Sequence, residues 1–310
     1  MTTAMISHEA ALGHVTPPGH PEQVARMDAV WGALAEMELL RLASPMAADD
    51  DILRVHPASH VAAVRRAAPE NGWISLDSDT HMSAGSLDAA YRAAGGALRA
   101  VDAVLGGEAD NAFVAMRPPG HHAEQTTAMG FCFFGNVAMA AKHALDHHGL
   151  RRVAIIDFDV HHGNGTQDLV EEDARILFVS THQMPLYPGT GAAHETGAHG
   201  NVLNIPLREG CDGATYRRIF ESQVVPAVEA HRPELILVSA GFDAHTADPL
   251  AGLELTTEDF AWITRRICAL ATNLCGGRLV SCLEGGYDLE ALAASAAAHV
   301  RELMEASRDG

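Results

Sequence analysis

The sequence predicts an α/β fold with a central, mostly parallel sheet that is covered by helices on both faces. Short apolar runs rich in β-branched residues alternate with helical patterns along most of the chain. Polar, glycine-rich segments follow these runs directly, as expected where binding loops leave the carboxyl ends of parallel strands. The 310 residues contain no repeat and no linker, so we expect one domain over residues 1–310.

Several apolar runs have the length and composition of strands that are buried on both sides. These runs are 112–116 (AFVAM), 152–158 (RVAIIDF), 176–180 (ILFVS), 234–240 (ELILVSA) and 278–286 (RLVSCLEGG). Since loops at the carboxyl ends of parallel strands share one edge of the sheet, the segments after these runs are expected to form one crevice.

Helices are predicted between the strands from the spacing of apolar residues. Apolar side chains recur every three or four residues between Leu87 and Leu105, which is the periodicity of one helix face. Further helices are expected at 136–148, 214–231, 257–274 and 289–305. Thr256 and Asp259 have the spacing of a capping box at the start of the third of these.

Composition and charge narrow the choice of partner and compartment. A formal charge of −19 argues against binding of nucleic acid phosphates and favours a basic protein segment or a polyamine. No run approaches the roughly 18 apolar residues of a membrane span. The five cysteines have no metal-binding or disulfide spacing, and the start of the chain lacks the pattern of a secretory signal, so we expect a cytoplasmic protein.

A group of acidic and histidine side chains predicts a metal site. Asp157, Asp159 and His161 alternate at the end of an apolar strand, so an extended backbone puts them on one side. Asp243 follows another strand and supplies a further carboxylate. Asp159, His161 and Asp243 would form a three-ligand site with an open position, which is typical of catalytic zinc.

Three further side chains near the same edge suit acid–base and electrostatic catalysis. His121 and His122 follow a rigid Pro-Pro-Gly turn and could act as general acid and base, with Asp157 and Asn164 available to orient their rings. Tyr287 follows Glu-Gly-Gly after the last strand, where its hydroxyl could polarise a scissile carbonyl.

Seven motifs, in order, resemble those of the histone deacetylase superfamily, in the class II-like branch that includes bacterial deacetylase-like amidohydrolases. They are RPPGHHA, GFCFFGNVA, DFDVHHGNGTQ, YPGTG, NIPL, LILVSAGFDAH with DPL, and EGGYDL. With HPE at 20–22 and LDSDT at 76–80, the resemblance covers most of the chain. It implies an arginase-like fold, one catalytic zinc ion and one or two structural potassium ions.

The resemblance also implies roles for individual residues. The zinc ligands it implies are the three already suggested by spacing, His122 is the expected general base, and Tyr287 is expected to stabilise the oxyanion. The other matching positions fall into three groups. Asp157 and Asn164 support the histidines; Asp157, Ser180 and Thr181, with the carbonyls of Asp159 and His161, match a potassium site; Phe131, Tyr187, Leu250, Asp79, Gly130 and Gly285 match the substrate tunnel and its rim.

The expected function is therefore zinc-dependent removal of acyl groups from lysine side chains or related amines. An acetylpolyamine or other small amide is the alternative substrate. A binuclear manganese ureohydrolase would carry Asp-x-Asp where this chain has Asp243 and His245, and a non-catalytic acyl-ligand sensor would lack turnover. Homo-oligomerisation is compatible with the sequence, and His8 and His14 receive no role.

Overall fold

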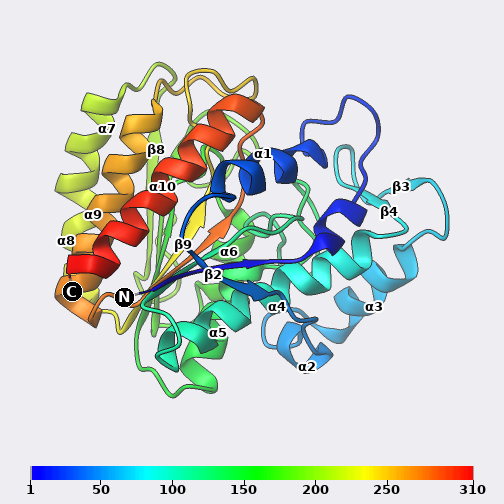
Figure 1. The fold of residues 1–310 in the computed structure, drawn as a ribbon, viewed down its shortest axis with the longest axis horizontal. Coiled ribbons are helices and arrows are strands. Elements are labelled where there is room, and N and C mark those ends of the chain that lie inside the picture. Colours follow the sequence, from blue (N-terminus) through cyan, green and yellow to red (C-terminus); the bar gives the residue numbers. More distant parts are fainter. Residues whose placement is uncertain (1, 310) are drawn as a thin grey trace.

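The computed structural model describes residues 2–309 and has one parallel eight-stranded sheet at its centre (Figure 1). The strand order is β2-β1-β5-β10-β9-β6-β7-β8, and every pairing is parallel. The strands are β1 (Thr3–Ser7), β2 (Leu40–Ala43), β5 (Asn111–Val114), β6 (Val153–Asp157), β7 (Ile176–Gln183), β8 (Val202–Leu207), β9 (Leu235–Ala240) and β10 (Leu279–Leu283). A short antiparallel pair, β3 (Trp73–Ser75) and β4 (His81–Ser83), lies outside this sheet.

Helices cover both faces of the sheet, as predicted. Helices α4 (Ser86–Leu105) and α5 (Asn136–Asp146) lie on one side, and α9 (Thr257–Cys275) and α10 (Leu289–Asp309) lie on the other (Figure 1). Other helices are α1 (Ala25–Leu34), α2 (Asp49–Ile52), α3 (Ala58–Ala67), α6 (Asn164–Val170) and the 3₁₀ turn η1 (Glu9–Gly13). The predicted cap of α9 is present, since the carboxylate of Asp259 accepts the backbone N–H of Thr256 at 2.9 Å.

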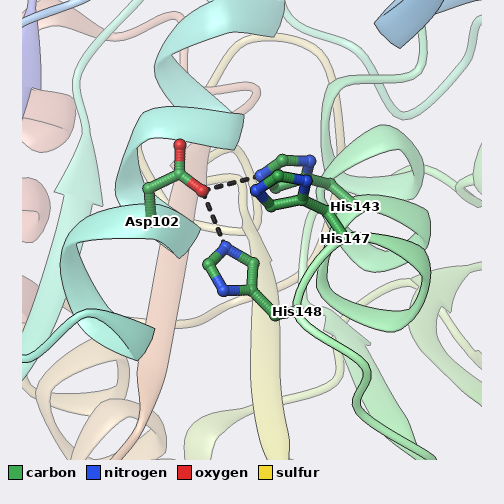
Figure 2. A group of neighbouring side chains, drawn as sticks. All are labelled: Asp102, His143, His147 and His148. Carbon is green, nitrogen blue, oxygen red and sulfur yellow. Dashed lines mark hydrogen bonds and ion pairs between the residues drawn. The ribbon is translucent and has the colours of Figure 1, made fainter.

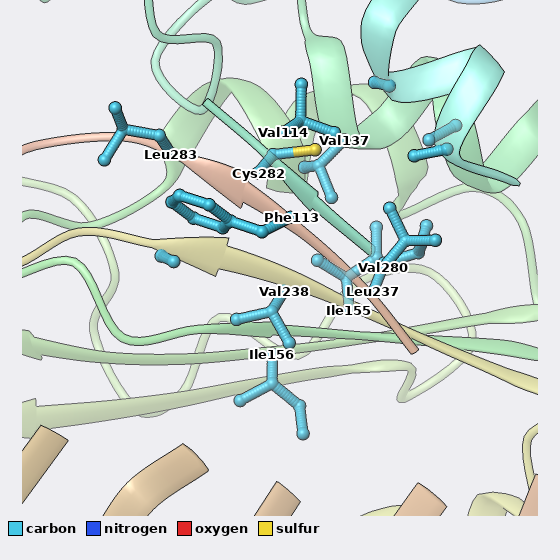
Figure 3. Packing of buried hydrophobic residues seen from close by; sticks show 14 of the residues in the cluster. Phe113, Val114, Val137, Ile155, Ile156, Leu237, Val238, Val280, Cys282 and Leu283 are labelled. Atoms are coloured by element: carbon cyan, nitrogen blue, oxygen red, sulfur yellow. The ribbon is translucent and has the colours of Figure 1, made fainter. Parts of the chain in front are cut away.

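The central strands are buried along their whole length, which explains their continuous apolar sequences. Their side chains pack with those of α5 in one core, where Phe113 lies close to residues of β9 and β10 (Figure 3). The register aligns the strand ends: Asp157 of β6 pairs with Ser180 of β7 and with Ser239 of β9. The loops after β6 and β9 therefore leave the sheet at nearly one level, whereas β7 continues to Gln183.

Several predicted elements end a few residues away from the expected position, and two of the differences have structural consequences. The expected helix at 214–231 is divided into α7 (Gly213–Ile219), a π turn η2 (Phe220–Val224) and α8 (Val225–His231). A proline in the first turn of α8 lacks the N–H that a continuous α-helix would use, which accounts for the division. The predicted strand at 278–286 ends at Leu283, so the Glu-Gly-Gly segment is already in the loop.

All five cysteines are buried free thiols. Within residues 2–309, no helix has the length and hydropathy needed to cross a bilayer.

Candidate active site

The loops after β5, β6, β9 and β10 bring the predicted site residues together at the carboxyl edge of the sheet. His161 is the meeting point: its Nδ1 lies 3.1 Å from Asp159 Oδ1 and 3.1 Å from Asp243 Oδ2. One potential ligand atom from each of these three side chains lies within 4.8 Å of the others, and all three residues are buried. The three side chains are thus close together as predicted, but β6 already ends at Asp157, so Asp159 and His161 are positioned by the loop after the strand and not by strand alternation.

Backbone groups hold the two carboxylates in place. The N–H of Gly285 donates to Asp159 Oδ2 at 2.9 Å, and the N–H of Val160 donates to Asp243 Oδ1 at 2.9 Å. A Cβ atom at Gly285 would lie 2.2 Å from Asp243 Oδ2, so only glycine allows the backbone to approach this closely. The carboxylates therefore point to a common position without freedom to turn away.

The electrostatics of this group fit a bound cation. Burial and the neighbouring Asp159 raise the pKa of Asp243 to about 7. Burial lowers the pKa of His161, but hydrogen bonds to Asp159 and Asp243 outweigh it and raise the value to about 10. Two buried carboxylates around one imidazole are stabilised by a positive charge, and one nitrogen with two oxygens is a ligand set that zinc accepts.

The two histidines of the Pro-Pro-Gly turn differ in their partners. His121 Nδ1 lies 3.1 Å from Asp157 Oδ2, whereas His122 Nδ1 lies 2.7 Å from Asn164 Oδ1. Asp157 and Asp159 outweigh burial and raise the pKa of His121 well above its ordinary value. Burial, followed by the charges of His121 and His161, lowers the pKa of His122 well below it. The pair thus combines a cationic ring with a neutral one.

A cavity of about 240 Å³ opens beside these groups. Its lining includes His122 and His161, and it contains five of the six residues expected to bind substrate. The lining residues are Pro21, Asp79, His122, Gly130, Phe131, His161, Leu186, Tyr187, Leu250 and Tyr287. Gly285, the sixth expected residue, does not line the cavity and instead packs against the carboxylates of Asp159 and Asp243.

Aromatic rings form much of the cavity wall. The ring of Phe131 lies edge-on to that of Tyr287 at 5.8 Å, and the ring of Tyr187 lies 5.1 Å from that of His122. Phe131 has a positive φ of 68°, an uncommon conformation for a bulky residue that tends to occur at functional sites. A Cβ at the preceding Gly130 would lie 2.4 Å from the His122 ring, so this turn packs directly on the histidine.

The residues expected to bind potassium also lie together. Asp157 and Ser180 are paired in the sheet, and the Thr181 hydroxyl donates to the carbonyl oxygen of Asp157 at 3.3 Å. The Thr181 hydroxyl also lies 2.7 Å from that of Tyr216. This oxygen-rich group adjoins the metal-ligand group, since the N–H of Asp159 donates to Asp157 Oδ1 at 3.1 Å.

Comparison with known proteins gives the family. Residues 20–303 match the histone deacetylase domain. The chain is 42% identical to a probable deacetylase of Archaeoglobus fulgidus, covering 94% of this chain and 82% of that protein. It is also 42% identical to a histone deacetylase-like amidohydrolase of Pseudomonas aeruginosa, covering 90% and 73%. The chain belongs to the histone deacetylase family.

A solved structure supports the same assignment. The crystal structure of the HDA15 HD domain superposes with a TM-score of 0.93 at 34% identity, covering 98% of this chain and 89% of that chain. The predicted arginase/deacetylase fold is therefore confirmed. The chain is a deacetylase or amidohydrolase of the histone deacetylase family, which is the reaction class predicted from the sequence.

This histone deacetylase family member also uses residues to which the sequence motifs assigned no role. Asp248 Oδ2 accepts the N–H of Tyr287 at 2.7 Å, and Asp248 Oδ1 accepts that of Leu250 at 3.0 Å. Glu284 Oε2 accepts the N–H of Gly120 at 2.7 Å, and burial raises the pKa of Glu284 to about 7. Asp248 lies in the DPL motif and Glu284 in the EGGYDL motif, so these two motifs could have pointed to both carboxylates.

A buried ionic cluster supports the tyrosine from the other side. Glu22 pairs with both Arg26 and Arg117, and these side chains are fully buried. Arg26 Nε donates to the carbonyl of Gly286 at 2.7 Å, and its guanidinium lies 5.0 Å from the centre of the Tyr287 ring. The i, i+4 spacing of Glu22 and Arg26 could have indicated the pair, but their link to the last strand is visible only in the fold.

His8 and His14, to which the sequence assigned no role, each make a defined contact in the structure. His14 Nε2 lies 3.3 Å from Glu22 Oε2, so His14 belongs to the buried ionic cluster. Burial is the main cause of its lowered pKa. His8 Nδ1 accepts the N–H of Ala10 at 3.0 Å and caps the 3₁₀ turn η1. Neither histidine lines the cavity, so both are structural supports.

Proposed function

We propose that this protein is a zinc-dependent deacetylase that hydrolyses acyl amides of lysine side chains or related amines. The observation that carries the proposal is the buried Asp159–His161–Asp243 group beside a narrow, aromatic-walled cavity. His122 and Tyr287 line the same cavity. A metal site, a neutral base and an oxyanion donor thus face one small volume, the arrangement that amide hydrolysis requires.

Asp159, His161 and Asp243 are the residues that would hold one zinc ion. When bound, zinc supplies a Lewis acid that polarises the substrate carbonyl and lowers the pKa of water toward about 7. The three ligands are nearly inaccessible to solvent and are fixed by backbone hydrogen bonds, so they are organised before substrate arrives.

His122 is the proposed general base. Asn164 Nδ2 donates to Glu124 Oε1 at 2.7 Å, which leaves Asn164 Oδ1 to accept the proton on His122 Nδ1. The lone pair of His122 is then on Nε2 and is free to take a proton from the attacking water. His121, held by Asp157, carries positive charge beside it and helps to return a proton to the leaving amine.

Tyr287 is the proposed oxyanion donor. Burial raises the pKa of its phenol well above the ordinary value, so the hydroxyl keeps its proton at neutral pH. Asp248 and Arg26 hold its backbone and its ring, which positions the hydroxyl for the developing negative charge on the former carbonyl oxygen.

The cavity supports acyl-lysine as the substrate class. Phe131 and Tyr187 supply apolar walls for an alkyl chain, and the rim residue Leu250 carries no charge that would attract a distant ammonium group. Asp79 lies at the same cavity and supplies a polar contact for the substrate backbone. An acetylpolyamine remains the alternative substrate.

The ureohydrolase reading has less support. His245, at the position of the second carboxylate in that family, has its Nδ1 3.1 Å from the N–H of Ala247 and its ring stacked on Phe260. It does not belong to the Asp159–His161–Asp243 ligand group. We therefore propose one catalytic metal ion.

Further parts of the proposal rest on the sequence and on placement. Asp157, Ser180 and Thr181, with the carbonyls of Asp159 and His161, are proposed to hold a structural potassium ion, because hard cations prefer oxygen ligands.

We propose that residues 1–310 form one catalytic domain. Five buried thiols are compatible with the predicted reducing, cytoplasmic compartment. Homo-oligomerisation and the lack of a nucleic acid partner stay predictions.

A turnover screen tests the proposal. Zinc-loaded protein would be assayed on acetyl-lysine peptides, trifluoroacetyl-lysine and acetylpolyamines, and release of the free amine would be measured. We expect acyl-lysine hydrolysis that a chelator abolishes and zinc restores. Binding of hydroxamates without hydrolysis of any acylated amine would instead support the sensor reading. If the protein hydrolyses acetylpolyamines better than acetyl-lysine peptides, acetylpolyamines are the substrate class instead of acyl-lysine.

A further inference from the structure

A second group of potential metal ligands lies outside the active site cavity. It consists of Asp102 near the end of α4 and of His143, His147 and His148 at the end of α5 (Figure 2). One ligand atom from each of the four side chains lies within 4.8 Å of all the others. We call this group the α4–α5 cluster.

The α4–α5 cluster lies at the amino edge of the sheet, opposite the active site. Helix α5 begins at Asn136, whose side chain donates to the carbonyl of Pro118 in the loop that carries His121. The helix has 11 residues and so extends about 16 Å before the chain turns back into β6. None of the three histidines lines the active site cavity.

The side chains converge as metal ligands do. His143 Nε2 and His148 Nε2 each lie 2.7 Å from the same atom, Asp102 Oδ1. His143 and His147 are one helical turn apart, and their rings stack at 4.8 Å with an angle of 9° (Figure 2). Four ligands bound tetrahedrally at about 2.0–2.1 Å lie roughly 3.4 Å from each other, so only small side-chain shifts are needed.

The electrostatic setting favours a cation. His147 caps the carboxyl end of α5, where carbonyl groups present a partial negative charge, and Asp102 adds a full one. A cation bound between these side chains would therefore be stabilised.

We propose that the α4–α5 cluster is a second transition-metal site, which binds Zn²⁺ as a structural ion. Imidazole nitrogens with one carboxylate suit borderline ions such as zinc rather than calcium or magnesium. Four protein ligands complete a tetrahedral shell, which is typical of structural zinc. The ion would join α4 to α5 on one face of the sheet.

Zinc content measured on four forms of the full chain tests the proposal. After dialysis against Zn²⁺ and removal of free metal, we expect about two zinc ions per chain in the wild type. Substitution of both His147→Gln and His148→Gln should leave one ion, and Asp243→Asn should also leave one. The combined variant should bind none. Matching zinc contents in the wild type and the His147→Gln/His148→Gln form would overturn the proposal.

Thermal unfolding gives a second readout that does not depend on counting ions. Zn²⁺ should raise the Tm of Asp243→Asn, because an ion that binds only the folded state stabilises it. It should not raise the Tm of the combined variant. The exposed His194, which lies outside the cluster, supplies the matched control, and His194→Gln should keep two ions. A Tm of Asp243→Asn that does not respond to Zn²⁺ contradicts the structural role.

If the double substitution impairs folding, His147→Gln alone is the milder variant, because His147 is exposed and Asp102 has no hydrogen bond to it among the described contacts. This variant should weaken Zn²⁺ binding at the α4–α5 cluster in a titration of the Asp243→Asn background. Unchanged affinity there would show that His147 is not a ligand and would overturn the four-ligand site.

Discussion

Two groups of histidine and aspartate lie at opposite edges of the same sheet, and they differ in how their side chains are held. In the active site, Asp159 and Asp243 are buried and accept backbone hydrogen bonds from neighbouring loops. In the α4–α5 cluster, Asp102 is partly exposed and contacts the side chains of His143 and His148. The same ligand types can thus form a pre-organised catalytic site or a surface site.

The difference lies in the backbone around the ligands. At the carboxyl edge, the loops after the strands fix the direction of each ligand and glycines let the next loop approach, as at Gly285. At the amino edge, the ligands lie on α4, on α5 and just after the end of α5, and their rotamers must be ordered when an ion binds. We therefore expect substitutions in the active site to change turnover strongly and substitutions in the α4–α5 cluster to change only metal binding and stability.

The largest expected effect is that of Asp243→Asn. It removes one charged ligand from a buried group, so the catalytic zinc ion and all measurable turnover should be lost. Measurement of kcat/KM on the best substrate, together with zinc content, checks this. Zinc retained at the amino edge would separate the two sites, whereas near-normal turnover would show that Asp243 is not a ligand.

Tyr287→Phe should lower kcat by about 10²–10³-fold, because it removes one oxyanion donor and almost no packing volume. Zinc content and Tm should be close to those of the wild type. Tyr91→Phe is the matched control, since its hydroxyl contacts Asp49 and lies outside the cavity. Equal kcat values for the two variants would assign the Tyr287 phenol a purely structural role.

Leu250→Glu should shift the ratio of kcat/KM values toward acetylpolyamines by roughly ten- to a hundredfold, since a rim carboxylate can pair with the distant ammonium group. Leu250→Gln, which has similar size and no charge, should leave the ratio near that of the wild type. The shift should weaken at high salt. A wild type that already prefers polyamines, with no response to Leu250→Glu, would assign selectivity to the entrance loops.

The smallest effect on turnover is expected at the amino edge. His148→Gln should leave kcat and KM on an acetyl-lysine peptide unchanged, because the α4–α5 cluster does not contact the cavity. Steady-state kinetics with saturating Zn²⁺ would measure this. A substantial fall in kcat with normal Tm would show that the two edges are coupled through α5. The α4–α5 cluster would then not be independent of the active site.

Much of the candidate site was predictable because its signals are local. Asp157, Asp159 and His161 follow one another closely at the end of β6, although the strand itself stops at Asp157, and the position of Asp243 follows from the shared edge of parallel strands. The cavity residues Phe131 and Leu250 came from the family resemblance, since neither has a chemical pattern of its own. The histidines of the α4–α5 cluster gave no such signal, because their acidic partner is on another helix.

Supports that join distant segments could not be predicted. Arg26 reaches the carbonyl of Gly286, and Asp248 accepts the N–H of Tyr287; nothing in the local pattern of either side chain specifies these contacts. Such pairs depend on how the loops pack after the sheet has formed. They are the contacts that hold the proposed oxyanion donor in position.

The sequence alone determined the fold class, the buried central strands and the edge of the sheet at which the ligands gather. These features depend on hydrophobic periodicity and on strand polarity, which are properties of short segments. Only the tertiary structure decided the edge strands, such as β8 with its Pro206, and the division of the helix at 214–231. Edge strands and helix breaks depend on neighbours far away in the sequence, because only contact with those neighbours provides their hydrogen bonds and buried surface.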